Sequence, residues 1–281
     1  MNGLSITVPT TFSRVLTDLS FIPDVVPEKV AYTGLFGGSE ASSLVNSATS
    51  DVKSVVTGIT TRAPERLSYY NGYFNFVSPN EDSSLSTGIR AGVPLASIDK
   101  NGYPATLVMS FRNAKKTKEI YRRLYPLASF FMSISSLTAA PVLFVALFIG
   151  DSGERRIAAW SGSIGDATSD SEAAKCSLPI DWQATTDLIT VGVSRSASGL
   201  VTLSAKVGGG AVQSTSYQFP IAADSGNPSD TEGRFLYGSM DTRTVESADI
   251  MTGQYWLNTA LTMSELQKQV ALIHLKANAR L

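Results

Sequence analysis

The sequence predicts an all-β protein whose strands form a two-layer sandwich. About ten short runs of apolar, β-branched and aromatic residues follow one another, separated by turns rich in Gly, Pro and Ser. Convincing helical spacing is confined to short segments near the two ends, so the strands do not alternate with helices as in an α/β fold. The chain has 281 residues, 43% of them hydrophobic, which is enough for one large core.

The most distinct strand predictions lie in the second half of the chain. The apolar run 142–149 is shorter than the ~20 residues of a membrane helix, and Pro141 and Gly150 bound it. We therefore expect a strand buried on both faces. Runs 188–194 and 200–207 flank Ser198-Gly199 and predict a hairpin. The other expected strands are 69–77, which alternates around Gly72, and 105–112, 156–160, 214–219, 235–237 and 249–257.

The C-terminal segment predicts a strand that passes directly into a helix. Alternation places Tyr255 and Leu257 on one face of the strand and Trp256 on the other. Thr262 stands three residues before Glu265, which is the spacing of a capping box at the start of a helix. The helix then carries an apolar stripe made of Leu266, Val270 and Ile273.

Residues 1–27 are expected to form an N-terminal arm, and residues 28–281 the sandwich domain. The arm has apolar residues at helical spacing but is too small to bury a core of its own. It either packs on the sandwich domain or docks on another subunit, and we favour docking on another subunit. It has no basic and apolar leader pattern, so no signal peptide is predicted. The residues expected to make the docking face are Phe12, Val15, Leu16, Leu19 and Phe21.

The order of these elements resembles the laminin-G-like, concanavalin-A-like jelly rolls. The resemblance rests on the aromatic-Gly motif at 70–74, the strand that ends in Gly150-Asp151, the hairpin, and the closing Leu-Thr-x-x-Glu-Leu at 261–266. It covers residues 66–275. Two details depart from the family: Asp187-Leu188-Ile189 replaces its Trp-His pair, and Gly208-Gly209 replaces its Asp-Gly. The resemblance implies a jelly-roll sandwich with a lectin-like surface.

The residues needed for catalysis are not found. Glucanases of this fold use Glu-x-Asp-x-x-Glu on one strand, and the nearest run, from Glu246 to Asp249, lacks the third acid. The one histidine, His274, is expected to pack on the sheet, and the one cysteine, Cys176, is expected to be a half-buried thiol. No catalytic residue, cofactor or metal ligand is therefore predicted. Calcium is kept as an alternative, with oxygen donors at Asp151, Asp166, Asp170 and Asp187.

The charge pattern gives little indication of a phosphate-binding surface. Net charge is −1 and charged residues make up 17% of the chain. One basic run, 112–123, includes Arg112, Lys115 and Lys116. It is expected to be a solvated loop or helix; the alternative is a surface for an anionic partner such as a polyanionic glycan or DNA. We expect neither nucleic-acid binding nor membrane insertion.

The functional hypothesis is a non-catalytic structural or adhesion protein of the virion of a tailed bacteriophage, assembled in the host cytoplasm as a homo-oligomer such as a trimer. It rests on fold analogy and composition. The alternatives are a bacterial carbohydrate-binding module or adhesin, and a glycoside hydrolase with an unfamiliar carboxylate arrangement. Sugar binding requires exposed aromatic rings beside polar groups. The candidate contacts near turns are Tyr103, Asp151, Glu154, Trp160 and Trp182.

Overall fold

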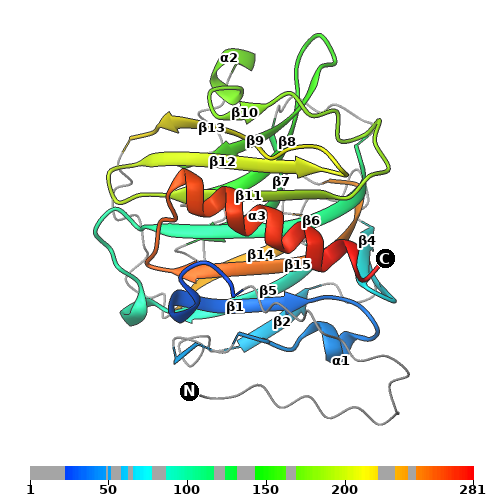
Figure 1. Ribbon diagram of the computed structural model, residues 1–281, viewed down its shortest axis with the longest axis vertical. Coiled ribbons are helices and arrows are strands. Elements are labelled where there is room, and N and C mark those ends of the chain that lie inside the picture. The colour runs from blue at the N-terminus through cyan, green and yellow to red at the C-terminus, as the bar shows by residue number, and fades with distance from the viewer. Residues whose placement is uncertain are drawn as a thin grey trace, which may run out of the picture.

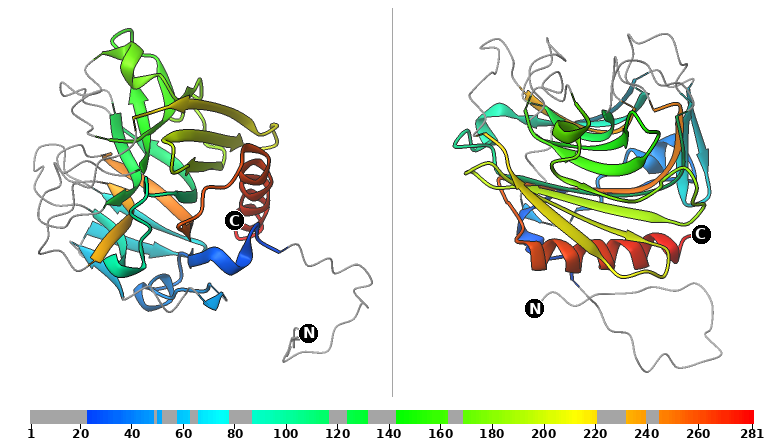
Figure 2. Two further views of the ribbon diagram at one scale, coloured as in Figure 1. Left: turned by 90° about the vertical axis from the view of Figure 1, so that its left-hand side faces the viewer. Right: turned by 90° about the horizontal axis from the view of Figure 1, so that it is seen from above.

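Two antiparallel sheets lie face to face in the computed structural model, and a long C-terminal helix lies on the outer side of one of them (Figures 1 and 2). The predicted all-β sandwich with a C-terminal helix is therefore confirmed. The structure describes residues 23–48, 50–51, 58–62, 66–77, 87–116, 124–131, 143–162, 169–220, 232–239 and 245–281. The predicted docking face of the arm, 12–21, lies outside these residues, as do Asp166 and 117–123 of the basic run.

Sheet A has eight strands in the order β13-β12-β11-β6-β15-β4-β3, with β1 beside β4 on the same edge of β15. Strand β15 therefore has β6 along one edge, while β4 pairs with its first half and β1 with its second half. The bounds are β1 (Val30–Leu35), β3 (Leu67–Tyr70), β4 (Tyr73–Val77), β6 (Ala105–Lys115), β11 (Ile189–Arg195), β12 (Leu200–Val207), β13 (Gln213–Gln218) and β15 (Ser247–Leu257).

Sheet B has seven strands in the order β10-β9-β8-β7-β14-β5-β2. Every residue of β8 is buried, which confirms the strand predicted at 142–149. The bounds are β2 (Gly58–Arg62), β5 (Thr87–Pro94), β7 (Leu124–Phe131), β8 (Leu143–Ile149), β9 (Arg155–Trp160), β10 (Ser177–Leu178) and β14 (Glu232–Ser239). The helices of the described residues are η1 (Pro27–Lys29), α1 (Glu40–Ser43), η4 (Leu95–Ser97), α2 (Asp170–Ala173) and α3 (Met263–Asn278).

The main core fills the space between the two sheets. Tyr255 and Leu257 point into it from β15, and Tyr255 stacks on Phe235 of sheet B with ring centroids 4.8 Å apart. Trp256 takes the opposite face and packs in a second, smaller core under α3. The two faces predicted for the C-terminal strand are therefore confirmed. Sheet A is buried on its inner side by sheet B and, in part, on its outer side by α3.

Helix α3 packs on sheet A by the predicted stripe: Leu266, Val270 and Ile273 are buried. Its N-terminus has the predicted capping box, in which the Glu265 amide donates to the Thr262 hydroxyl and the Thr262 amide donates to the Glu265 carboxylate. The helix comes close to β11 because residue 192 is glycine. A Cβ atom there would lie 2.8 Å from the side chains of both Leu266 and Val270.

Two further side chains of this region bear on the sequence predictions. His274 is buried, and its Nδ1 lies 3.0 Å from the hydroxyl of Thr190 in β11, so the predicted packing on the sheet is confirmed. Cys176 is fully buried against the main core, so the half-buried thiol expected there is wrong. No described helix is both long enough and apolar enough to cross a membrane.

Of the two segments with a glycine turn, one forms the hairpin predicted for it and the other differs from its prediction. The hairpin predicted around Ser198-Gly199 is confirmed, since β11 and β12 pair antiparallel along their length. The single strand predicted at 69–77 is wrong: it is a hairpin, with β3 and β4 joined at Asn71-Gly72. Gly72 has φ +87°, a left-handed conformation that glycine adopts without strain, so the chain reverses there.

The described chain begins on the outer side of sheet A, where it is fixed in place. The Asp24 carboxylate accepts hydrogen bonds from Gln269 and Lys276 of α3, both at 2.9 Å. The Trp256 indole donates to the carbonyl of Val25 at 2.8 Å. Residues 23–26, the last part of the expected arm, are therefore attached to the domain itself.

Candidate functional site

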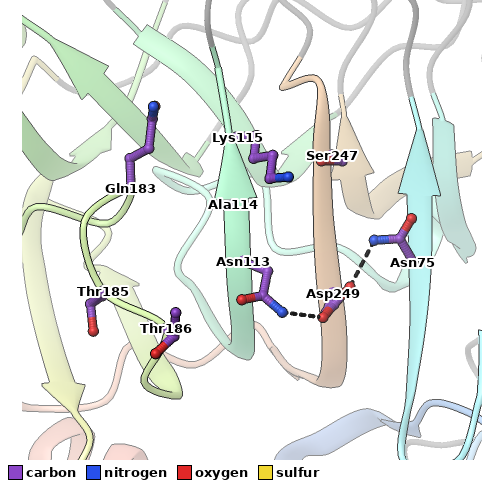
Figure 3. A pocket seen from close by; sticks show the side chains of 9 residues that line it. All are labelled: Asn75, Asn113, Ala114, Lys115, Gln183, Thr185, Thr186, Ser247 and Asp249. Atoms are coloured by element: carbon purple, nitrogen blue, oxygen red, sulfur yellow. Dashed lines mark hydrogen bonds between the residues drawn. The ribbon is translucent and has the colours of Figure 1, made fainter.

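A polar pocket of about 640 Å³ lies on sheet A next to the β10–β11 loop. Such a volume lies within the range of ligand sites, ~300–1,000 Å³. It is close to the C-terminal end of α3: Met251, two residues after the lining residue Asp249 in β15, packs in one small cluster with Ala277 of α3. We call it the Asp249 pocket. Its lining comes from strands β4, β6 and β15 and from the loop: Asn75, Asn113, Ala114, Lys115, Gln183, Thr185, Thr186, Ser247 and Asp249 (Figure 3).

The local shape of the pocket depends on a β-bulge in β6. Ser247 pairs with Lys115 and Asp249 with Arg112, so β6 has one more residue than β15 between these pairs. Asn113 lies in this bulge with φ 52°, a left-handed conformation that asparagine tolerates better than most residues. A bulge turns side chains away from the regular alternation. As a result, Arg112 and the next residue, Asn113, both reach Asp249.

The Asp249 carboxylate is the centre of the hydrogen-bond network. It is only 6% exposed, and one oxygen accepts a hydrogen bond of 2.7 Å from the amide nitrogen of Asn75. The other oxygen accepts 2.7 Å from the amide nitrogen of Asn113 and 3.3 Å from the Arg112 guanidinium (Figure 3). A buried carboxylate with three donors is a fixed structural anion that holds both amides in one orientation.

Several polar groups of the lining are left for a ligand. The side-chain carbonyl of Asn113 points away from Asp249, toward the loop that carries Thr185 and Thr186 (Figure 3). The ammonium group of Lys115 lies on the Ser247 side of the pocket. Hydroxyls, amides and one cation are groups that bind a hydroxyl-rich molecule. Of the described lining residues, Asp249 alone is an acid and none is histidine or cysteine, so the lining offers no acid–base pair.

A pair of aromatic rings, one exposed and one half-buried, continues the site at the β3–β4 hairpin. Tyr70, 48% exposed, stacks on Tyr73 with centroids 4.9 Å apart and an interplanar angle of 17°. The guanidinium of Arg112 lies 5.1 Å from the Tyr73 ring centroid while its Nε donates to Asp249. Arg112 thus connects the aromatic pair to the Asp249 pocket. The pair is a flat apolar surface next to a polar cavity.

The aromatic residues predicted to touch a glycan are in the interior. Tyr103, Trp160 and Trp182 are 2%, 4% and 0% exposed, so the expectation that these rings are exposed is wrong. The Trp182 indole donates to the Arg156 carbonyl at 3.1 Å, and Trp160 packs edge-on against Phe219. Both rings are buried through contacts with residues distant in sequence.

The predicted acids lie in a different place. Asp151 and Glu154 are exposed at the β8–β9 turn, as expected for a turn, and neither they nor the three aromatic residues line the Asp249 pocket. The alternative of calcium gains no support from geometry: among the residues that the structure describes, no three His, Cys, Asp or Glu side chains come together.

Sequence reasoning missed the Asp249 pocket, although two signals were available. Asp249 is flanked by Ala248 and Ile250 in a run that otherwise predicts a strand, and a charged residue there requires partners when buried. Asn113 follows Arg112 at the end of an apolar strand, where asparagine often marks a break in regular pairing.

Comparisons with known proteins find likeness of fold only. No protein-family model and no curated protein sequence matches the chain. The binding domain of Paraclostridial Mosquitocidal Protein 1 is similar over 88% of this chain and 53% of its own, at 10% identity and TM-score 0.49. The type G botulinum neurotoxin receptor-binding domain is similar over 87% and 51%, at 9% identity and TM-score 0.48.

A plant lectin is also similar to the chain. Peanut lectin matches over 83% of this chain and 98% of its own, at 12% identity and TM-score 0.45. The chain thus spans about half of each toxin domain but nearly the whole lectin. At these scores the likeness carries no functional conclusion, and none of the three structures is a phage protein, so the virion hypothesis gains no support from them.

Proposed function

We propose that the protein is a non-catalytic binding module whose Asp249 pocket and adjoining tyrosine pair hold a glycan. The observation that carries the proposal is the buried Asp249 carboxylate, which fixes the amides of Asn75 and Asn113 beside open hydroxyl groups. Planar amides in a fixed orientation suit the paired hydroxyls of a sugar ring. The exposed face of Tyr70 suits the apolar face of a neighbouring ring.

The decisive variant is Asn113→Gly. Glycine accepts φ 52° without strain, so the bulge is kept while the amide is lost. We expect glycan affinity, measured by calorimetry after a screen on a glycan panel, to fall by about 3- to 10-fold, the value of one neutral hydrogen bond. Asp249→Ala removes the group that orients both amides and is expected to lower glycan affinity more than tenfold.

A matched control is available at the opposite end of β15. Asn258 also has φ 52°, and its side chain bonds the backbone of Ser97 and Asp99, away from the pocket. Asn258→Gly should leave affinity unchanged. Equal losses in both glycine variants, or no saccharide bound by the wild-type chain, would refute the pocket as a glycan site.

We further propose that the module is a virion component of a tailed bacteriophage, displayed in several copies on the tail, fibre or capsid surface through its N-terminal arm. Low charge, a sequence without a recognised catalytic motif and the apolar residues at 12–21 support this reading. Many copies of a weak site give useful avidity. Mass spectrometry of purified particles and solution mass test it: a free monomer with glycan affinity would instead favour a bacterial carbohydrate-binding module or adhesin.

A further inference from the structure

We propose that the ligand of the Asp249 pocket is an acidic sugar, whose carboxylate binds the Lys115 ammonium. The inference rests on the proposed glycan-binding function and adds the chemical class of the ligand. It starts from the charged side chains of the lining, a cation on Lys115 and an anion on Asp249, and from the cation of Arg112 that bonds Asp249.

Asp249 and Arg112 already neutralise each other. Their ion pair of 3.3 Å joins side chains that are 9% and 26% exposed, and Arg112 also lies over the Tyr73 ring. A ligand that used either charge would have to break this arrangement, which would leave a buried group without its partner. Neither charge is available to select a ligand.

The charge of Lys115, unlike those of Asp249 and Arg112, is available to a ligand. It is exposed at the end of β6, opposite Ser247, and no ion pair holds its ammonium group within the part of the chain that the structure describes. The acids that flank the loop are oriented elsewhere. The Asp181 carboxylate accepts from the amides of Gln183 and Ala184, and the Asp187 carboxylate lies against the turn at Gly208.

One cation beside neutral hydrogen-bonding groups selects a ligand with one negative charge per binding unit. A carboxylate on a sugar ring fits this pattern, with the Ser247 and Thr186 hydroxyls as further donors. Nucleic acid and heavily sulfated glycans are bound by several Lys and Arg side chains, whereas Lys115 is the one cation among the described lining residues. The alternative given for the basic run at 112–123 was a surface for an anionic partner. We infer that Lys115, in the described part of this run, binds a small acidic ligand instead of a polyanion.

The experiment measures affinity for matched acidic and neutral sugars by calorimetry. One arm compares 3′-sialyllactose with lactose, and the other compares trigalacturonate with a neutral galactose trisaccharide, which separates sialic acid from uronic acid as the source of the carboxylate. In one of the two comparisons we expect the acidic sugar to bind about tenfold tighter than its neutral counterpart, because it forms one partly desolvated ion pair with Lys115. The preference should shrink as salt rises.

Variants at position 115 test the residue directly. Lys115→Gln keeps most of the side-chain length and should abolish the acidic preference, whereas Lys115→Arg keeps the charge and should retain it. Lys268→Gln, on the exposed side of α3, is the matched control and should change nothing. Because Lys115 is exposed, these variants should fold; identical thermal unfolding of all four proteins checks this.

The outcomes separate the inference from the proposed function. If neutral sugars bind as tightly as acidic ones, or if Lys115→Gln leaves the preference intact, the acidic class is wrong and glycan binding stands. A sulfated disaccharide or a short oligonucleotide that binds as tightly as the carboxylated sugar also overturns the assignment. If no saccharide binds, both fail.

Discussion

Gly192 in β11 gives a prediction whose sign opposes the usual rule. Replacing a strand glycine by alanine normally stabilises a protein by ~0.4–1 kcal/mol, because the unfolded chain loses freedom. Here the added Cβ would lie 2.8 Å from Leu266 Cδ1 and 2.8 Å from Val270 Cγ2, both on fully buried side chains of α3. Carbon atoms in contact prefer ~3.5–4.0 Å, so an overlap of roughly an ångström must be relieved.

Relief requires α3 to move away from sheet A or its side chains to leave their rotamers. Overpacking of this kind costs ~1–3 kcal/mol. After subtraction of the gain in the unfolded state, Gly192→Ala should lower the free energy of unfolding by about 1–2 kcal/mol. In the double variant with Val270→Ala the two effects should be less than additive by at least ~0.5 kcal/mol, since the smaller side chain makes room.

Urea denaturation followed by far-UV circular dichroism measures these differences. Gly209→Ala is the matched control: the residue is exposed in a turn, its φ is not left-handed, and a Cβ would meet nothing within 4 Å. It should be neutral or slightly stabilising. A stabilising or neutral Gly192→Ala would refute the tight packing of α3 on β11.

Three other predictions concern single groups. Thr262→Ala removes the α3 cap and should lower the free energy of unfolding by about 1 kcal/mol in urea, and Thr262→Ser should restore most of it; an unaffected alanine variant would contradict the cap. Burial and, to a smaller extent, the positive charge of Lys206 lower the pKa of His274 in the folded protein. As pH falls, the unfolded chain therefore takes up a proton at this residue before the folded chain does. The contribution of His274 to the free energy of unfolding should be complete above the ordinary imidazole pKa of about 6.5 and should decline below it. His274→Gln should flatten this slope between about pH 6.5 and 5, above most carboxylate pKa values, and an unchanged slope would mean that another group is responsible. Burial raises the pKa of the Cys176 thiol to about 12, so iodoacetamide at pH 8 should label it only as urea unfolds the chain, and rapid native labelling would show that the thiol is accessible.

The local pattern of the sequence was sufficient where burial follows from periodicity. Alternation alone placed Tyr255 and Trp256 on opposite faces of one strand, and the structure buries the first in the main core and the second under α3. It was insufficient where glycine or proline interrupts a strand. Strands β5 and β7 were not predicted because Gly88, Gly92 and Pro126 obscure their alternation. Both strands pair with neighbours on both edges, a tertiary contribution that local propensity does not include.

The site was less predictable because its geometry depends on register between distant strands. Asp249 meets Asn75 and Asn113 only when β15 lies between β4 and β6, and the bulge that orients Asn113 exists only in that pairing. Proximity to a turn was a poor guide to exposure. Trp160 and Trp182 are near turns in the sequence, yet partners elsewhere in the chain bury them.

The position of β15 also has a consequence for synthesis. Val30 and Phe74 each pair with residues of this strand, Trp256 and Ile250, so both early strands must wait for a partner that is synthesised much later. Contacts between residues so distant in sequence slow folding. Until β15 leaves the ribosome, the exposed edges of β1, β4 and β6 can pair with neighbouring nascent chains. Chaperone demand during expression should therefore be high, and slower translation should not relieve it.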